Sequence, residues 1–230
     1  MGNLAEQRGY TYEDYLKWDD GVRYELIDGT AYAMASPSRL HQEVSREILT
    51  QLSVFLRGGA CRVFHAPFDV RLNFDSFDDI VVQPDILVVC DESKLDSKGV
   101  KGAPDMVIEI LSPSNTRHDT VIKAILYRKA GVREYWTVDP NAKTVQVYIL
   151  ENGRYTVSDY GGNDIIPVHT LKGCQINLAE VFFYDTIEPE REYDEWEIKQ
   201  RIIRAFRETG ISDEQIEKAI AKLNKGNESE

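Results

Sequence analysis

The sequence has no long hydrophobic run and little cysteine. No apolar stretch among the 230 residues approaches the roughly 18–20 that a membrane-spanning helix requires. The N-terminal stretch MGNLAEQRGYTYEDY also lacks the apolar core of a signal peptide. We therefore expect a cytoplasmic protein without a membrane partner. The three cysteines, Cys61, Cys90 and Cys174, are widely spaced among apolar or small residues, which predicts reduced core residues rather than a disulfide framework or a zinc site.

Positive charge is also scarce. The chain carries 27 lysine and arginine residues against 39 aspartate and glutamate residues, for a formal net charge of −12 at pH 7. This excess of acidic residues argues against a protein that coats nucleic acid non-specifically, because such binding depends on a basic surface. Residues 94–133 differ, since they carry eight basic and four acidic side chains. That pattern fits either a local basic groove in an acidic enzyme or a solvated charged face.

The order of predicted elements indicates an α/β domain followed by a helical tail. A short helix is expected in TYEDYLKWDD, a hairpin around IDGT, and an amphipathic helix over 38–56, where apolar residues recur every four positions. Strands are expected at 62–65, 68–74, 86–90 and 105–111, a helix from about 116 to 129, and strands in EYWTVD, TVQVYIL and RYTVSDY. We expect an α+β fold with a central mixed β-sheet flanked by helices over residues 1–187, and a C-terminal helical extension over 188–230.

A single acid interrupts the most apolar of these strands. In APDMVIEILSPSN, residues 103–115, period-two alternation places Glu109 on one face of the strand with Val107 and Leu111. Burial of an ionised carboxylate is costly unless a cation or hydrogen-bond donors compensate it. The earlier strand in QPDILVV also carries one acid, Asp85, at its start. If the two strands are neighbours, the two acids converge, and a divalent ion that prefers oxygen, such as Mg²⁺, is their natural partner.

These segments resemble the PD-(D/E)XK nuclease superfamily and, more closely, the Uma-type family of bacterial restriction-endonuclease-like proteins. The match extends over about residues 10–185 and rests on RYELIDG, QPDILVV, GAPDMVIEILSPSN, the pair Lys123 and Tyr127, and GVREYWTVDP. The resemblance implies a restriction-endonuclease-like core and an endonuclease that hydrolyses phosphodiester bonds. It also implies Mg²⁺ as the cofactor, with Mn²⁺ as a substitute, and nucleic acid, DNA above all, as the partner.

The resemblance assigns roles to particular residues. Asp85 and Glu109 become catalytic metal ligands, and the backbone carbonyl of Ile110 completes the metal shell. The motif has lysine where this sequence has Leu111, and the resemblance suggests that Lys123 in the following helix supplies the ammonium. Carboxylate-held Mg²⁺ and one ammonium together serve to activate a water and to neutralise the charge that grows on the phosphate.

Further residues are candidates for support of this site. On the helix that begins near Ser38, His41 is a candidate to orient water or phosphate, and Glu43 or Glu47 is a candidate for a further metal ligand. Glu25 in RYELIDG either approaches the site or only packs. Tyr127, one turn after Lys123, either supports that lysine or fills the core. These alternatives stay open at the level of sequence.

The main residues have plainer interpretations as well. Glu109 fits a structural acid paired with a buried arginine or tyrosine, Asp85 fits a simple strand end, and Lys123 fits a surface residue paired with Asp119. Asp105, in a second Pro-Asp pair, is expected only to start its strand. If the missing motif lysine is decisive, the alternative to an endonuclease is a catalytically silent module that keeps the nuclease fold and binds nucleic acid or assembles.

The tail predicts self-association. Cutting both strands of a duplex requires two active centres, which a closed twofold dimer supplies most simply. The segment from about 188 to 222 carries apolar residues such as Trp196, Ile202 and Phe206. We therefore expect a homodimer with this tail near its interface.

Overall fold

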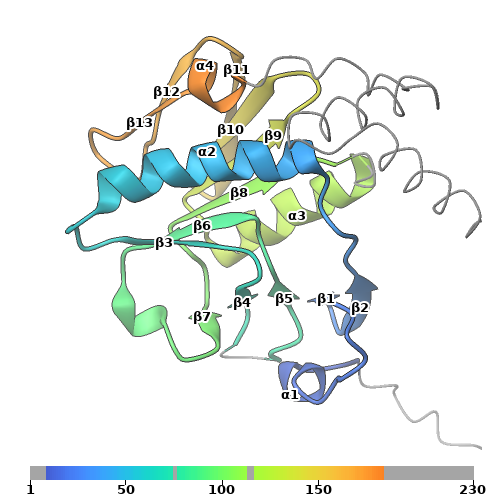
Figure 1. Ribbon diagram of the computed structural model, residues 1–230. Helices are drawn as coiled ribbons and strands as arrows, with labels where there is room; N and C mark the ends of the chain where they lie inside the picture. The colour runs from blue at the N-terminus through green and yellow to red at the C-terminus, as the bar shows by residue number, and fades with distance from the viewer. Residues whose placement is uncertain (1–8, 75–76, 113–116, 184–230) are drawn as a thin grey trace, which may run out of the picture. The chain divides into compact units, whose positions relative to one another are not determined.

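Residues 9–74, 77–112 and 117–183 are described by the structure, a computed structural model. The chain divides into two units, Met1–Tyr184 and Asp185–Glu230. The expected helical extension over 188–230 and its part in self-association lie outside the described residues, which end at 183. Over the described residues, the first unit has a mixed α+β architecture with sheets of six, five and two strands, and helices flank the six-stranded sheet (Figure 1). The expected fold class is confirmed.

The six-stranded sheet has the order β11-β10-β9-β8-β6-β3. Its strands are β3 (Arg62–His65), β6 (Ile86–Val89), β8 (Met106–Ile110), β9 (Glu134–Asp139), β10 (Thr144–Glu151) and β11 (Arg154–Gly161). β8 and β9 run parallel and the other neighbours run antiparallel. Every residue of β6 and β8 is buried. Apart from Glu109, both strands are apolar, which suits central strands that are covered on both faces.

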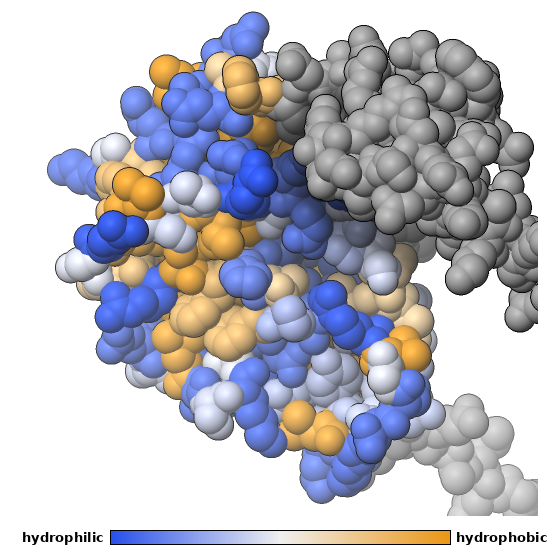
Figure 2. Space-filling view, viewed as in Figure 1, coloured by the Kyte–Doolittle hydropathy of each residue, from blue (hydrophilic) through white to orange (hydrophobic). Residues whose placement is uncertain are grey.

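Helices cover both faces of this sheet. α2 (Arg39–Leu56) begins at the cap Ser38 and packs its apolar stripe on the face that carries the even-numbered residues of β8. α3 (Arg117–Ala130) places Leu126 and Tyr127 on the other face, together with apolar residues of the five-stranded sheet. On the side that carries α2, hydrophilic and hydrophobic side chains are interspersed (Figure 2), so the acidic composition does not give a uniformly polar surface.

The five-stranded sheet has the order β2-β1-β5-β4-β7 and contains the expected hairpin. Its strands are β1 (Tyr24–Ile27), β2 (Thr30–Ala33), β4 (Asp69–Arg71), β5 (Val81–Val82) and β7 (Gly99–Lys101). The hairpin turns at Asp28 and Gly29, which both have positive φ, and this tight two-residue turn matches the twist of the paired strands. β5 and β7 escape sequence prediction because strands of two or three residues are too short to show alternation.

Short elements complete the first unit. They are α1 (Tyr12–Tyr15), a 3-10 turn (Glu92–Lys94), β12 (Ile165–Pro167), β13 (Gln175–Asn177) and α4 (Leu178–Val181). β12 and β13 pair into the two-stranded sheet, and apolar residues of β13 and α4 join the core on the α2 face of the six-stranded sheet. No helix in the described ranges is long and apolar enough to cross a membrane.

The prediction of three reduced cysteines is wrong for two of them. Cys61 and Cys90 form a disulfide, whereas Cys174 is free and buried. β3 and β6 pair antiparallel with Arg62 opposite Val89, and the same register continued by one residue sets the two cysteines opposite each other. The sequence shows both strands but not that they are neighbours, so it contains no signal for this pairing.

Candidate active site

The register of β6 and β8 brings Asp85 and Glu109 together. Ile86 pairs with Ile108 in this antiparallel ladder, and the same register continued by one residue sets Asp85 opposite Glu109. Directly opposed residues on antiparallel strands share a face, with Cβ atoms about 4.5–5.5 Å apart. Asp85 is also anchored to β8, because its Oδ2 accepts the backbone N–H of Ile110 at 2.7 Å. The two strands are neighbours and the two acids converge.

Lys123 compensates the buried acid of β8. Its Nζ lies 3.0 Å from Oε1 of Glu109 and 3.0 Å from Oε1 of Glu25, and the Lys123 side chain is only 15% exposed. Tyr127, one turn later on α3, donates its hydroxyl to Glu109 Oε1 at 2.6 Å. α3 covers the Glu109 face of the sheet, so both side chains reach the acid from the same helix. The interpretation of Lys123 as a surface residue is therefore wrong.

Burial sets the protonation behaviour of this cluster. It raises the pKa of Glu109 to about 7, with further increases from Asp85 and Glu25, although the charge of Lys123 and the hydrogen bond from Tyr127 act in the opposite direction. Burial also acts to lower the pKa of Lys123, but the carboxylates of Glu109 and Glu25 outweigh it and hold that pKa above its ordinary value. Lys123 is therefore charged at neutral pH, and a divalent cation would favour the ionised form of Glu109.

His41 holds the other acid from the side of α2. It lies in the first turn of α2, three residues after the cap Ser38, and its Nε2 lies 3.1 Å from Asp85 Oδ2. Burial acts to lower the pKa of His41, but the hydrogen bond to Asp85 and the charges of Asp85 and Glu109 outweigh it and raise the pKa. Nδ1 of His41 is buried and has no hydrogen-bond partner among the described residues. The imidazole thus fixes the orientation of Asp85 between helix and strand.

These side chains line a pocket of about 320 Å³. One part of its wall is charged, with Glu25, Asp85, Glu109 and Lys123. Another part comes from the hairpin and the largely apolar segment 33–37 that leads into α2. A pocket of this size is within the range of sites for small ligands, so it has room for one phosphate group and its neighbours on a chain.

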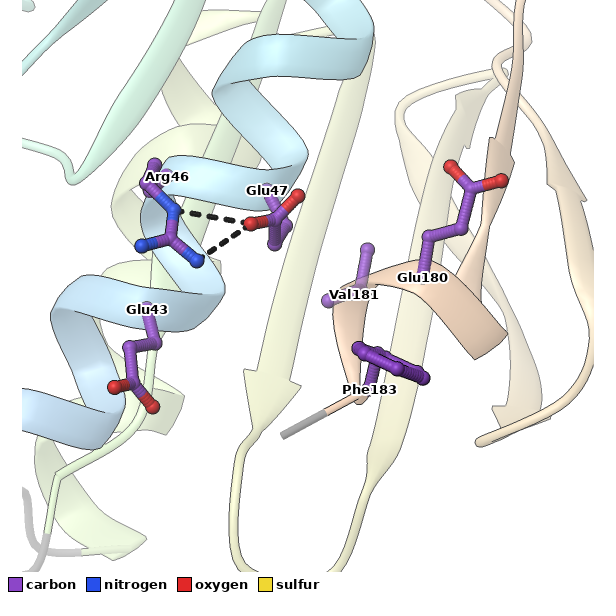
Figure 3. Close-up of a pocket in the computed structure, with 6 residues that line it drawn as sticks. All are labelled: Glu43, Arg46, Glu47, Glu180, Val181 and Phe183. Carbon is purple, nitrogen blue, oxygen red and sulfur yellow. Dashed lines mark hydrogen bonds and ion pairs between the residues drawn. The ribbon is translucent and has the colours of Figure 1, made fainter. Parts of the chain in front are cut away.

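Glu43 and Glu47 do not line this pocket. They line a separate one of about 360 Å³ between α2 and α4, together with Arg46, Glu180, Val181 and Phe183 (Figure 3). Successive residues of an α-helix are rotated by about 100°, so Glu43 projects away from the side on which His41 reaches Asp85. The spacing of His41 with the buried Val44 and Ile48 is the sequence signal that separates His41 from the two glutamates.

Asp105 is a structural residue, as its place at the strand start predicts. Its Oδ2 accepts the backbone N–H of Cys90 at 2.6 Å, and its Oδ1 accepts a hydrogen bond from the guanidinium of Arg133. These bonds tie the start of β8 to its two neighbouring strands. Asp105 therefore takes no part in the pocket.

Arg23 and Gln83 are among the pocket residues that sequence reasoning misses. The backbone N–H of Gln83 donates to Glu25 Oε1 at 3.0 Å. Its side-chain Oε1 accepts hydrogen bonds from Nε and Nη2 of Arg23 at 3.0 and 2.8 Å. One signal was available: Arg23 precedes Glu25 by two positions in extended chain, which places both on one face.

The oxygen atoms of the pocket suit a hard divalent cation. Oδ1 of Asp85 and Oε2 of Glu109 accept no hydrogen bond from the described residues. Within the same residues, no group of three or more His, Cys, Asp or Glu side chains is arranged to hold a metal ion. Mg²⁺ is commonly bound through one or two carboxylates and keeps several waters. Asp85 and Glu109 are therefore the residues of this pocket that could hold Mg²⁺, with water in the remaining positions.

Comparison with known proteins decides the family. A family model described as "Uma2: Putative restriction endonuclease" matches residues 12–179. The chain belongs to the Uma2 family. The Uma2 resemblance seen in the sequence is thus confirmed, and it places the protein in a family of nuclease type.

Two similar proteins add to the comparison. An uncharacterised protein of Synechocystis sp., slr1290, is 26% identical over 164 residues, which cover 69% of this chain and 84% of that protein. The crystal structure of a protein from Anabaena variabilis, described as a putative nuclease belonging to DUF820, matches with a TM-score of 0.61 at 22% identity. The match covers 75% of this chain and 97% of that chain. At this identity the structural likeness shows the fold alone.

Proposed function

We propose that this Uma2 protein is an Mg²⁺-dependent endonuclease that hydrolyses phosphodiester bonds, with DNA as its substrate. The observation that supports the proposal most strongly is the position of Lys123. Its ammonium lies 3.0 Å from Glu109, although the motif position holds Leu111. The main ground for a catalytically silent module is the missing motif lysine, and a lysine from α3 supplies the same charge at the acid.

Each residue of the pocket has a role in this proposal. Asp85 and Glu109 would hold the ion, together with the carbonyl of Ile110. When bound, Mg²⁺ polarises a phosphoryl oxygen and favours ionisation of a coordinated water. Lys123 keeps Glu109 in place and offers a buried positive charge where negative charge grows on the phosphate. His41 keeps the Asp85 carboxylate directed into the pocket.

The test is a cleavage assay with the full chain. Supercoiled, linear and single-stranded DNA and an RNA of matched sequence are incubated with Mg²⁺, Mn²⁺ or EDTA. We expect cleavage of DNA only with a divalent ion, and Lys123→Ala is expected to lose on the order of a hundredfold in rate, as for removal of a single charge-stabilising donor. Glu47→Gln, in the other pocket, is the control and is expected to cut like the wild type.

The outcome of this assay separates the two functions. A folded wild-type protein that cuts none of these substrates would make the silent binding or assembly module the better account. Cleavage of the RNA alone would keep the phosphodiesterase and overturn the choice of DNA. A Lys123→Ala protein with the wild-type rate would remove the catalytic role given to this lysine.

A further inference from the structure

Arg23 is a half-buried cation in the wall of the active-site pocket. Its Nε and Nη2 donate to Gln83 Oε1 at 3.0 and 2.8 Å, and Nη2 lies 3.8 Å from the sulfur of Met34. A guanidinium carries five N–H donors. The contacts above involve only Nε and Nη2, and the two donors on Nη1 have no hydrogen-bond partner among the described residues. No described carboxylate pairs with Arg23 either. Its charge is held by neutral groups.

Arg71 shows how the same fold holds another half-buried arginine. Its Nε and Nη2 donate to the two carboxylate oxygens of Asp78 at 2.9 and 2.5 Å. Arg71 thus has a carboxylate as its partner, whereas Arg23 has only the neutral amide oxygen of Gln83. The charge of Arg23 therefore lacks a paired counter-charge. Partial burial of an uncompensated charge is unfavourable. An anionic ligand in the pocket would supply the missing charge, and the planar fork of a guanidinium suits phosphate.

The surrounding contacts hold Arg23 in position. The backbone N–H of Met34 donates to the Arg23 carbonyl at 2.8 Å, which continues the register of the hairpin by one residue. Gln83 is oriented by its own donors, since its Nε2 donates to Tyr15 Oη at 3.0 Å and to Asp69 Oδ1 at 2.8 Å. The amide oxygen therefore faces Arg23. A guanidinium that is fixed in advance loses little conformational freedom when it binds a ligand.

The spacing along the strand places Arg23 beside the acids and not among them. Arg23 and Glu25 are two residues apart on one face of extended chain, which corresponds to roughly 6.6–6.8 Å. Glu25 contacts Lys123, and Lys123 contacts Glu109. Arg23, Asp85 and Glu109 line the same pocket. A strand whose scissile phosphate lies at Asp85 and Glu109 can therefore place a neighbouring phosphate at Arg23.

We propose that Arg23 binds the phosphate adjacent to the scissile one, so that the site selects a polynucleotide strand over an isolated phosphodiester. The proposal rests on the endonuclease function proposed above. It makes Arg23 a specificity-determining residue, because bis(4-nitrophenyl) phosphate has a diester bond to cut and no second phosphate. The segment of the substrate that the pocket recognises is then at least a dinucleotide with two phosphates.

The test compares two substrates. Arg23→Gln is assayed with Mn²⁺ on a single-stranded DNA oligonucleotide and on bis(4-nitrophenyl) phosphate. Loss of one charged hydrogen-bonding contact is expected to raise KM for DNA by about 10- to 100-fold, with a much smaller effect on the small diester. Arg23→Lys is expected to recover part of the loss. Arg46→Gln, which changes the net charge equally in the other pocket, serves as the control and is expected to behave like the wild type.

Equal losses on both substrates would overturn the proposal, because Arg23 would then act on the acids or on the fold. An unchanged KM for DNA would overturn it as well. Thermal unfolding shows whether Arg23→Gln is folded. If it is not, Arg23→Lys takes its place, since it keeps the charge and loses the fork, and the expected loss on DNA has the same direction and a smaller size.

A binding measurement separates this proposal from the function on which it rests. Fluorescence anisotropy of labelled single-stranded DNA with Ca²⁺ requires no cleavage. We expect weaker binding by Arg23→Gln and a salt dependence that is reduced by about 0.7 in slope, the value for one contact to a single strand. If the wild type cuts neither substrate, the endonuclease function fails and this comparison still decides the role of Arg23. Equal affinities, or no binding by the wild type, would overturn it.

Discussion

Replacement of Lys123 by methionine removes a cation and keeps an unbranched side chain. Nζ of Lys123 lies 3.0 Å from carboxylate oxygens of both Glu25 and Glu109. At an effective dielectric constant of about 20, each contact corresponds to about 5 kcal/mol of Coulomb energy before desolvation is subtracted. Removal of one partner from a buried ion pair generally costs about 3–5 kcal/mol. We expect a loss of this size in the free energy of unfolding, whereas an exposed pair contributes at most about 1 kcal/mol.

The loss should depend on pH, because Glu109 can take up a proton. Burial raises its pKa from 4.5 to about 7 in the folded protein, so between these two values the folded state binds more protons than the unfolded state. Stability due to this group therefore falls as pH rises through that window. The charge of Lys123 opposes the rise in pKa. Without Lys123, the pKa of Glu109 in the folded protein is higher, so the pH range over which stability falls extends further upward. Between about pH 6 and pH 8, Lys123→Met should therefore lose more stability than the wild type.

Urea unfolding followed by tryptophan fluorescence measures this effect, with EDTA present so that no divalent ion replaces the lysine. Lys129→Met, on the exposed side of the same helix, is the control and should change stability by no more than about 0.5 kcal/mol. Addition of Glu25→Gln to Lys123→Met should restore stability, because it removes the facing like charge. The reasoning would be refuted if Lys123→Met lowered the free energy of unfolding by less than about 1 kcal/mol. It would also be refuted if the loss were equal at about pH 6 and about pH 8.

Three further predictions concern the metal, the tyrosine and the tail. Asp85→Asn and Glu109→Gln should each weaken Mn²⁺ binding in calorimetry while the fold is kept, since each removes a negative ligand and little volume; unchanged affinity in both would contradict the ligand assignment. Tyr127→Phe removes the donor to Glu109 and should cost about 1–3 kcal/mol in urea unfolding; a neutral change would show that the bond adds no net stability. Light scattering should show a dimer for the full chain and weaker association for a chain that ends near Ile187; a monomeric full chain would refute the homodimer.

Local pattern was sufficient for the long elements of the fold. The four-residue recurrence of Val44, Ile48 and Leu52 and the cap Ser38 predict α2 almost to its observed bounds, because periodicity and capping are properties of one segment. β5 and β7 are too short to carry a pattern. The pairing of Cys61 with Cys90 depends on which strands are neighbours, and sequence order does not determine that when non-consecutive strands pair.

The candidate site was predictable in part for the same reason. Asp85 and Glu109 stand out because each is an acid at or within an apolar strand. Lys123 could be connected to Glu109 only through the family resemblance, since the helix that carries it reaches the acid by packing across the sheet. Arg23 belongs to the N-terminal arm of the hairpin in the five-stranded sheet. The sequence places it on one face with Glu25, but the approach of that face to Asp85 and Glu109 results from the way the two sheets pack, which no single segment encodes.

The most direct test of the metal site is a crystal of the full chain soaked in Mn²⁺, with anomalous scattering recorded to locate the ion. The account predicts an anomalous peak between the carboxylates of Asp85 and Glu109, within coordination distance of the Ile110 carbonyl. The same peak should be absent from crystals of Glu109→Gln. An ion found among Glu43, Glu47 and Glu180 in place of this position, or no peak at the two acids in well-ordered crystals, would contradict it.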